Sequence, residues 1–218
     1  MNGARFRDRF HAGRRLAAVL APYARSPNLL VLALPRGGVP VGYEVARALN
    51  APLDVMLVRK LGVPGHEELA MGAIASGGIR VLSDDIVSAF RIPERVIATV
   101  AANEQEELDR RERAYRDDRP PPEIRGRTII LVDDGLATGS TMRAAAAALR
   151  AQHPEKLVVA VPVAPLETCA MLRNEVDDVV CAMVPEPFLA VGNWYSDFSQ
   201  TTDEEVRELL RAAEASVA

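Results

Sequence analysis

One segment of the sequence combines a pair of carboxylates with a short run of small and hydroxyl-bearing residues. Residues 129–132 are apolar, Asp133 and Asp134 follow them, and residues 137–141 read Ala-Thr-Gly-Ser-Thr. A helix that begins in such a run presents backbone N–H groups and the positive end of its dipole to an anion. The carboxylates would repel that anion unless they face vicinal sugar hydroxyls or a divalent metal ion. The segment therefore predicts a site for a phosphorylated sugar.

The string from Ile129 to Thr141 resembles the signature with which type I phosphoribosyltransferases bind 5-phosphoribosyl-1-pyrophosphate (PRPP). Gly135 departs mildly from that signature, in which an aliphatic residue is commoner. An ordinary strand–turn–helix with acidic residues at the sheet edge is the alternative, and it would suit a lone Asp-Asp pair. The sequence contains neither G-x-x-x-x-G-K-[ST] nor G-x-G-x-x-G.

The resemblance implies a role for each part of the segment. Asp133 and Asp134 would hold the ribose hydroxyls, and Mg²⁺, the expected cofactor, would use the same pair. The 5′-phosphate would be held by Ala137, Thr138, Gly139, Ser140 and Thr141.

A second anion loop is expected in Leu34-Pro35-Arg36-Gly37-Gly38, which ends an apolar run. Gly37 and Gly38 would let backbone amides approach an anion closely, and Arg36 offers a bidentate fork to phosphate oxygens. The family places its pyrophosphate loop here. A glycine-rich turn into the next helix is the alternative.

Arg59 and Lys60 follow the second predicted strand, where members of the family carry cations for the leaving pyrophosphate. Lys60 is one of only two lysines among 26 basic residues, which favours a role that arginine would not serve. The segment after Lys60 resembles the family's mobile loop, and Glu68 within it could act as acid, base or structural anchor. The candidate catalytic residues are therefore Arg59, Lys60 and Glu68.

The nucleobase is expected beneath a hood formed by residues 185–198. Phe188 or Tyr195 could stack on an aromatic base, a contact worth about 1–3 kcal/mol in nucleic-acid binders, or the rings could only pack the tail against the sheet. In family members that use 6-oxopurines an Asp takes the place of Ala137 and a Lys follows the next strand. This chain has Ala137 and Val163-Ala164-Pro165 there. Both differences speak against hypoxanthine and guanine.

Short apolar runs alternate with helical periodicity, which is typical of a parallel sheet with helices on both faces. Residues 59–82 are rich in glycine and predict a long mobile loop, with possible hairpin arms at 71–75 and 79–82. Expected strands are residues 29–34, 53–58, 128–132, 157–163 and 179–184; expected helices are residues 5–25, 39–49, 93–119, 141–150, 166–174 and 202–213.

We therefore expect an α/β fold with a doubly wound, mainly parallel five-stranded sheet, which is the type I phosphoribosyltransferase fold. Residues 1–218 would form a single domain with a core at about 28–184, a flexible hairpin loop at about 59–82 and a small C-terminal hood at about 185–200. Opposite charges four residues apart, such as Glu107/Arg111 and Glu112/Arg116, indicate a solvated face on the long charged helix.

Composition limits the partners. A formal net charge of −4 and 5% aromatic residues argue against a nucleic-acid surface. No apolar run is long enough to cross a membrane, so the cytoplasm is the expected location. Cys169 and Cys181 lack metal-ligand or redox spacing and predict plain core thiols. PRPP and a small-molecule base are the expected partners, together with a second copy in a homodimer.

The predicted function is transfer of the phosphoribosyl group from PRPP to a nitrogen nucleophile, usually of a nucleobase. A regulator that senses PRPP without transferring it is an alternative, although an acidic single domain lacks the surface or extra domain of such proteins. A phosphatase would want Asp-x-Asp after its first strand, whereas Asp133 and Asp134 are adjacent and follow the third.

Overall fold

The computed structural model describes residues 5–116 and 119–217, apart from the side chains at 67, 68, 216 and 217. Its centre is a parallel five-stranded sheet with the order β2-β1-β6-β7-β8. The strands are β1 (Leu29–Ala33), β2 (Leu53–Val55), β6 (Thr128–Val132), β7 (Lys156–Val163) and β8 (Asp178–Met183). The predicted doubly wound α/β fold is therefore confirmed.

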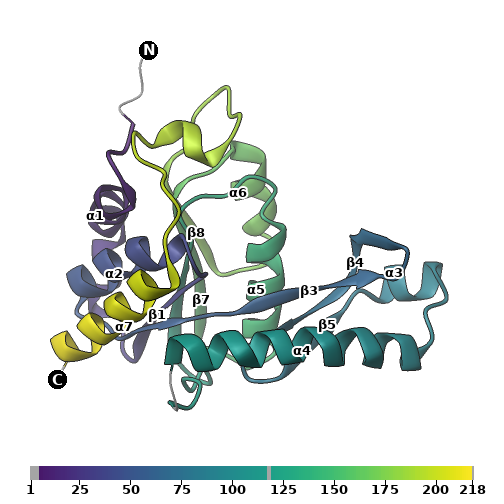
Figure 1. The fold of residues 1–218 in the computed structure, drawn as a ribbon. Helices are drawn as coiled ribbons and strands as arrows, with labels where there is room; N and C mark the ends of the chain where they lie inside the picture. The colour runs from purple at the N-terminus through teal and green to yellow at the C-terminus, as the bar shows by residue number, and fades with distance from the viewer. Residues whose placement is uncertain (1–4, 117–118, 218) are drawn as a thin grey trace.

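Helices cover both faces of this sheet (Figure 1). Strand β1 is buried throughout, and its alternate residues face opposite layers, with Val31 and Ala33 in one core cluster and Leu30 and Leu32 in the other. This double burial explains why the strands read as continuous apolar runs. The first layer contains α1 (Arg9–Leu20), α2 (Gly38–Leu49) and α7 (Asp203–Val217); the second contains α5 (Ser140–Arg150) and α6 (Leu166–Leu172).

The second predicted strand, residues 53–58, is in fact divided between two sheets. Strand β2 ends at Val55, and Val58 begins β3 (Val58–Val63) in a separate antiparallel sheet. Between them, the amide of Leu57 donates to Oγ of Ser76 over 3.0 Å, which turns the chain toward the new sheet. The apolar run is continuous across this change of sheet, so its pattern could not show the break.

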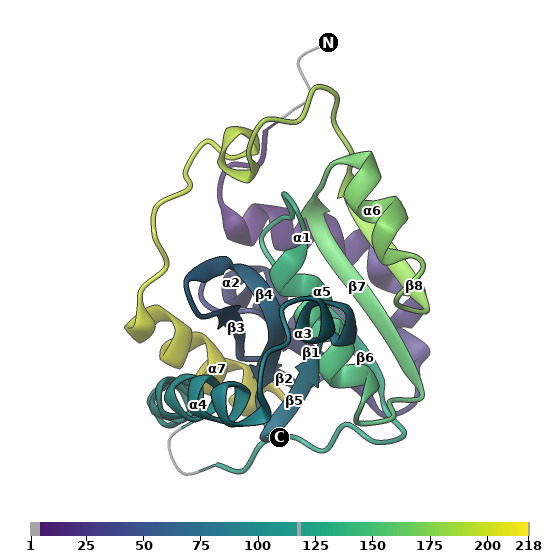
Figure 2. The ribbon, with the colours of Figure 1, turned by 90° about the vertical axis from the view of Figure 1, so that its right-hand side faces the viewer.

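The segment expected as a mobile loop is a regular sheet, with β4 (His66–Ala75) between β3 and β5 (Ile79–Leu82). The expected hairpin is present, and Gly77 and Gly78 both take positive φ in its turn, a conformation that glycine adopts without steric cost. Helix α3 (Asp84–Ala89) follows, and α4 (Glu94–Arg116) packs against β3 and α7. In Figure 2 this antiparallel sheet extends toward the viewer and is seen nearly end-on.

Helix α4 is less solvated than its charge pattern suggests. The ion pairs Glu107–Arg111 and Glu112–Arg116 form as expected. Arg116, however, is only 2% exposed, and it donates to Asp54 over 2.9 Å and to the carbonyl oxygen of Val55. The prediction of a surface position for Arg116 was wrong, because the end of α4 packs against β2 and Arg116 pairs there with the carboxylate of Asp54. Residues 117 and 118 of the predicted helix lie outside the described part of the chain.

The hood, residues 185–200, is irregular apart from the short helix η2 (Val191–Trp194). It is fastened to the amino-terminal segment, because the amide of Phe6 donates to the carbonyl of Trp194 and the amide of Ser196 donates to the carbonyl of Phe6, each over 2.8 Å. Figure 1 shows the two segments meeting above the sheet. Thr202 caps α7, since its hydroxyl accepts the amide of Glu205 over 3.1 Å.

The prediction of plain core thiols was also wrong. The structure joins Cys169 of α6 to Cys181 of β8 in a disulfide. The two cysteines are 12 positions apart in sequence, and their proximity follows from the packing of α6 on β8. Every helix in residues 5–116 and 119–217 is too short or too polar to span a bilayer.

Candidate functional site

Two loops meet where the parallel strands β1 and β6 end. Asp133 and Asp134 follow β6, and Pro35–Gly38 follows β1, whose residues pair in register with those of β6. The approach is close: a β-carbon at Gly37 would lie 2.1 Å from Oδ2 of Asp134, and one at Gly38 would lie 2.9 Å from the carbonyl oxygen of Val132. A larger residue at Gly38 would overlap backbone atoms, and one at Gly37 would displace the carboxylate of Asp134. The structure thus brings together the acidic pair and the candidate pyrophosphate loop.

The acidic pair is partly buried. Burial, followed by the negative charge of Asp134, raises the pKa of Asp133 well above its usual range, while the backbone amide of Asp134 donates to Asp133 Oδ1 over 2.8 Å. Burial also raises the pKa of Asp134, although the hydrogen bond from Arg9 opposes this shift. Two buried carboxylates of this kind are stabilised by hydrogen-bond donors or positive charge, which a ligand can supply.

Sequence patterns gave no signal for Arg9, the first residue of α1. Its Nε lies 2.8 Å from Oδ2 of Asp134, and its Nη1 donates to the carbonyl oxygen of Ser199 over 2.6 Å. Arg9 and Asp134 are 125 residues apart in sequence, and nothing local predicts their pairing. The site therefore includes a cation from the amino-terminal helix.

The loop from Ala137 to Thr141 leads into α5 as predicted. Gly139 is the N-cap, with a positive φ of 73°, and a β-carbon there would lie 2.8 Å from the side chain of Thr168. The hydroxyl of Thr168 donates to the carbonyl oxygen of Ala137 over 2.7 Å, which ties the loop to α6. Thr138, Ser140 and Thr141 border the start of α5, which presents hydroxyls and the positive end of its dipole to an incoming anion.

Lys60 and Arg59 lie on opposite faces of β3, as neighbouring strand residues must. Lys60 lines a cavity of about 110 Å³ together with Ser140 and Thr141, which begin α5. Arg59 faces α4, where its guanidinium makes a 2.6 Å ion pair with Glu104. From the sequence, both cations were expected to face the leaving pyrophosphate. The structure brings Lys60 to the loop and turns Arg59 away from it, which corrects that expectation.

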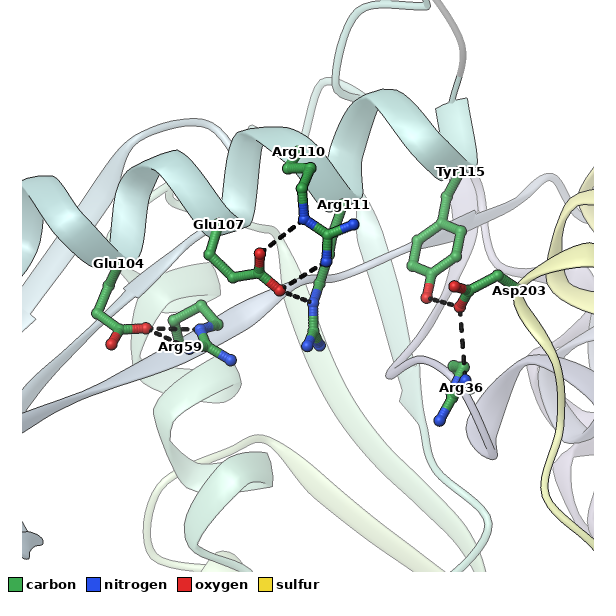
Figure 3. Close-up of polar contacts among 8 residues, drawn as sticks. All are labelled: Arg36, Arg59, Glu104, Glu107, Arg110, Arg111, Tyr115 and Asp203. Carbon is green, nitrogen blue, oxygen red and sulfur yellow. Dashed lines mark hydrogen bonds and ion pairs between the residues drawn. The ribbon is translucent and has the colours of Figure 1, made fainter.

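Arg36 reaches from the loop after β1 toward α7. Its Nη1 lies 3.7 Å from Oδ1 of Asp203, which also accepts a 2.6 Å hydrogen bond from the phenol of Tyr115 on α4 (Figure 3). Burial, followed by this hydrogen bond, raises the pKa of Tyr115 to about 12. In Figure 3, Arg59 and Arg36 thus lie beneath one helix, each beside a carboxylate.

The predicted base-stacking role does not fit Tyr195. Its side chain is only 4% exposed, its ring packs on Phe6 and Phe198, and its phenol donates to the backbone oxygen of Asp134 over 2.5 Å. Tyr195 therefore fastens the hood, which was the alternative considered for these rings. Phe188 is partly buried against the same cluster. Glu68 lies in β4, and its side chain falls outside the described part of the chain.

Gly135 differs from the aliphatic residue that is commoner at its position in the family, and packing explains the difference. A β-carbon there would lie 2.5 Å from Cγ1 of Val191 in η2 and 3.0 Å from Cγ1 of Val163 in β7. The side chain of Val191 thus occupies the space that an aliphatic residue at this position would need. The packing of Val191 in the hood therefore requires a small residue at Gly135, directly after the acidic pair.

The acidic pair can supply part of the coordination that a divalent cation needs. Within the described residues, no group of three or more His, Cys, Asp or Glu side chains is placed to hold a metal ion. Asp133 and Asp134 offer the oxygen ligands that Mg²⁺ prefers, and their buried charges favour a cation. An ion held by them would complete its coordination with water and substrate oxygens, which is usual for Mg²⁺.

Comparison with known proteins gives the site a family. The phosphoribosyl transferase domain model matches residues 7–186. A protein of Mycobacterium tuberculosis, whose phosphoribosyl transferase name is itself provisional, is 46% identical over 208 residues, covering 95% of this chain and 47% of that protein. The chain thus spans about half the length of the curated relatives that it matches.

A ribose-phosphate pyrophosphokinase of Methanopyrus kandleri is 30% identical over 174 residues, covering 69% of this chain and 60% of that protein. The crystal structure of the protein TT1426 from Thermus thermophilus superposes with a TM-score of 0.86 at 45% identity, covering 94% of this chain and 97% of that one. With the family model matching most of the sequence, the chain belongs to the phosphoribosyl transferase family.

Proposed function

We propose that this protein transfers the 5-phosphoribosyl group of PRPP to a nitrogen nucleophile and releases pyrophosphate. The observation that carries the proposal is the contact between Gly37 and Asp134, which places a candidate pyrophosphate loop directly against a candidate ribose clamp. A ribose that carries hydroxyls and a diphosphate on adjacent carbons would contact the loop and the clamp at the same time. The Methanopyrus relative, named for a ribose-phosphate and pyrophosphate reaction, supports this class of ligand.

Each group has a defined task in this scheme. Asp133 and Asp134 accept hydrogen bonds from the ribose 2′- and 3′-hydroxyls and hold the ring. Residues 137–141 bind the 5′-phosphate through amides and hydroxyls at the start of α5. The amides of Gly37 and Gly38 and the ammonium of Lys60 would bind the diphosphate, and Arg36 would join them on leaving Asp203. Mg²⁺, when bound, would neutralise charge on the departing pyrophosphate.

In the reaction, the bond from C1 of the ribose to the pyrophosphate oxygen breaks, and its electron pair leaves with pyrophosphate. The nitrogen of the acceptor forms the new bond to C1 from the opposite face and loses a proton. The transition state resembles an oxocarbenium ion, as in glycoside cleavage. The side chains around the leaving group stabilise its growing negative charge, and the hood keeps water from competing for C1.

The acceptor is proposed to be a nucleobase other than a 6-oxopurine. Ala137 and Ala164 stand where a carboxylate and a cation would be needed to recognise such a base, and Ala164 is fully buried. Phe188 stays a candidate for stacking on the base, and Glu68 stays a candidate for proton transfer. A homodimer is also expected, which analytical ultracentrifugation would check.

Two measurements in sequence test the proposal. Titration calorimetry with PRPP and Mg²⁺ should show binding, and a screen of bases should then reveal pyrophosphate release with at least one of them. Binding without release for any base would instead favour a PRPP-sensing regulator. Absence of PRPP binding would reject both functions.

A further inference from the structure

Arg9 lies well inside the site, although it belongs to the amino-terminal helix. The side chains of Arg9 and Asp134 are only 11% and 15% exposed, and Nε of Arg9 is 2.8 Å from Oδ2 of Asp134. Burying two charges costs free energy that is recovered only when their geometry is good and their remaining donors are satisfied. Arg9 has a short contact with Asp134, and a second of its donors, Nη1, has a partner in the carbonyl oxygen of Ser199.

The guanidinium of Arg9 is held on three sides. Besides the contact with Asp134, its Nη1 donates to the carbonyl oxygen of Ser199 over 2.6 Å. Its Cζ lies 4.0 Å from the centre of the Phe198 ring, a favourable cation–π arrangement. The planar fork of arginine has a fixed geometry. Arg9 is therefore a rigid donor that the hood keeps in position.

The pair also fills the space above the candidate pyrophosphate loop. A β-carbon at Gly37 would lie 2.1 Å from Oδ2 of Asp134 and 3.2 Å from Nε of Arg9. Asp133 and Asp134 are adjacent carboxylates that repel each other. Without an opposing attraction, the side chain of Asp134 would turn away from Asp133 into any space that the loop allows.

We infer that Arg9 is a positioning residue of the PRPP site, which holds the carboxylate of Asp134 against Gly37 so that the acidic pair can accept the ribose hydroxyls. This inference rests on the proposed function. Arg9 does not contact the ligand itself. It acts through Asp134, while Ser199 and Phe198 of the hood prevent its guanidinium from moving toward the anionic substrate.

Substitution of Arg9 tests the inference, and the same helix provides a matched control. Arg9→Gln removes the charge but keeps a polar side chain, and the dissociation constant for PRPP measured by calorimetry should rise roughly tenfold or more. Arg14→Gln removes another arginine of α1, which pairs with Glu44 over 2.6 Å, and should leave PRPP affinity unchanged. Arg9→Lys keeps the charge without the fork and should give an intermediate affinity.

A second readout separates positioning from general structural damage. Inorganic phosphate, followed through the NMR shift of the Gly139 amide, probes the loop that starts α5. Arg9→Gln should leave this binding within about twofold of the wild-type value while PRPP binding falls, because the loop does not contact Arg9. Equal loss of both ligands would overturn the inference.

A double-mutant cycle tests the route of action. In an Asp134→Asn background, adding Arg9→Gln should weaken PRPP binding by less than about twofold. A full further loss there, or PRPP binding by Arg9→Gln as tight as or tighter than that of the wild type, would refute positioning through Asp134. Failure of the wild-type protein to bind PRPP would instead reject the proposed function, and the inference with it.

Discussion

The phenol of Tyr195 donates a hydrogen bond to the backbone oxygen of Asp134 over 2.5 Å, which joins the hood to the turn that carries the acidic pair. Arg9 holds the side chain of the same aspartate. The backbone of Asp134 is thus held by Tyr195, near the C-terminal end of the chain, and its carboxylate is held by Arg9, near the N-terminal end. The candidate site depends on contacts between residues that are far apart in the chain.

Tyr195→Phe should lower the free energy of unfolding by about 1 kcal/mol, because it leaves a buried carbonyl oxygen without its donor. Urea unfolding followed by circular dichroism measures this. Tyr43→Phe on α2 is a control, since the hydroxyl of Tyr43 has no hydrogen-bond partner among the described residues. Similar losses for both variants would show that the contact with Asp134 contributes nothing specific.

Gly135→Ala should destabilise the protein by about 1–3 kcal/mol, because the added methyl group would overlap Val191. The double variant Gly135→Ala/Val191→Ala should recover part of this loss, since it removes the side chain that lies 2.5 Å from the new β-carbon. Thermal unfolding of the two proteins gives the comparison. If the second substitution adds to the damage, the contact between hood and turn is not the cause.

Lys60→Gln should weaken PRPP binding about tenfold to a hundredfold, because it removes a charged donor beside Ser140 and Thr141. Arg59→Gln should change it by less than about threefold, since Arg59 faces Glu104 on the other side of β3. Calorimetry of both variants under the same salt conditions decides between them. A larger effect at Arg59 would mean that its ion pair with Glu104 opens when PRPP binds.

Without ligand, Asp133 should reduce stability as the pH rises. Burial and the charge of Asp134 raise its folded-state pKa, so the folded protein binds a proton more tightly than the unfolded chain does. Stability therefore falls as pH rises from the ordinary aspartate value of 3.8 through the raised value. Asp133→Asn should be more stable than the wild type at pH 7 and bind PRPP poorly.

Asp134→Asn should stabilise the protein less at pH 7 than Asp133→Asn does, because the pKa of Asp134 is also raised but the substitution leaves the guanidinium of Arg9 without its carboxylate. We expect the fold to be retained and PRPP binding to be weakened. Denaturation at pH 4 and pH 7 measures both aspartate variants. If Asp133→Asn is less stable than the wild type at pH 7, the charge of Asp133 is compensated in the folded protein.

Much of the parallel sheet could be predicted from the sequence, because local pattern and burial agree there. Residues 128–132 are mostly apolar and form a fully buried strand. The helix from Ser140 begins where small residues and hydroxyls indicate it. For the same reason, the acidic pair and the candidate phosphate loop could be proposed, since each is a contiguous segment attached to a regular element.

The remaining features depend on contacts that have no local pattern. Arg9 resembles any other arginine of an arginine-rich helix until the fold places it beside Asp134. Arg59 and Lys60 are adjacent in sequence. Their side chains point to opposite faces because both lie in β3, and that strand was not predicted. Tyr195 is an aromatic residue of the kind that can stack on a base. Its ring is buried because it packs on Phe6, which lies near the other end of the chain.

The separation of Lys60 from the acidic pair has a further consequence. Lys60 belongs to the antiparallel sheet, whereas Asp133 and Asp134 follow a strand of the parallel sheet. A ligand that contacts both would link two sheets that share no ladder of hydrogen bonds. Its binding free energy would then oppose local opening of β3–β5, so amide exchange in that sheet would slow as the ligand concentration rises.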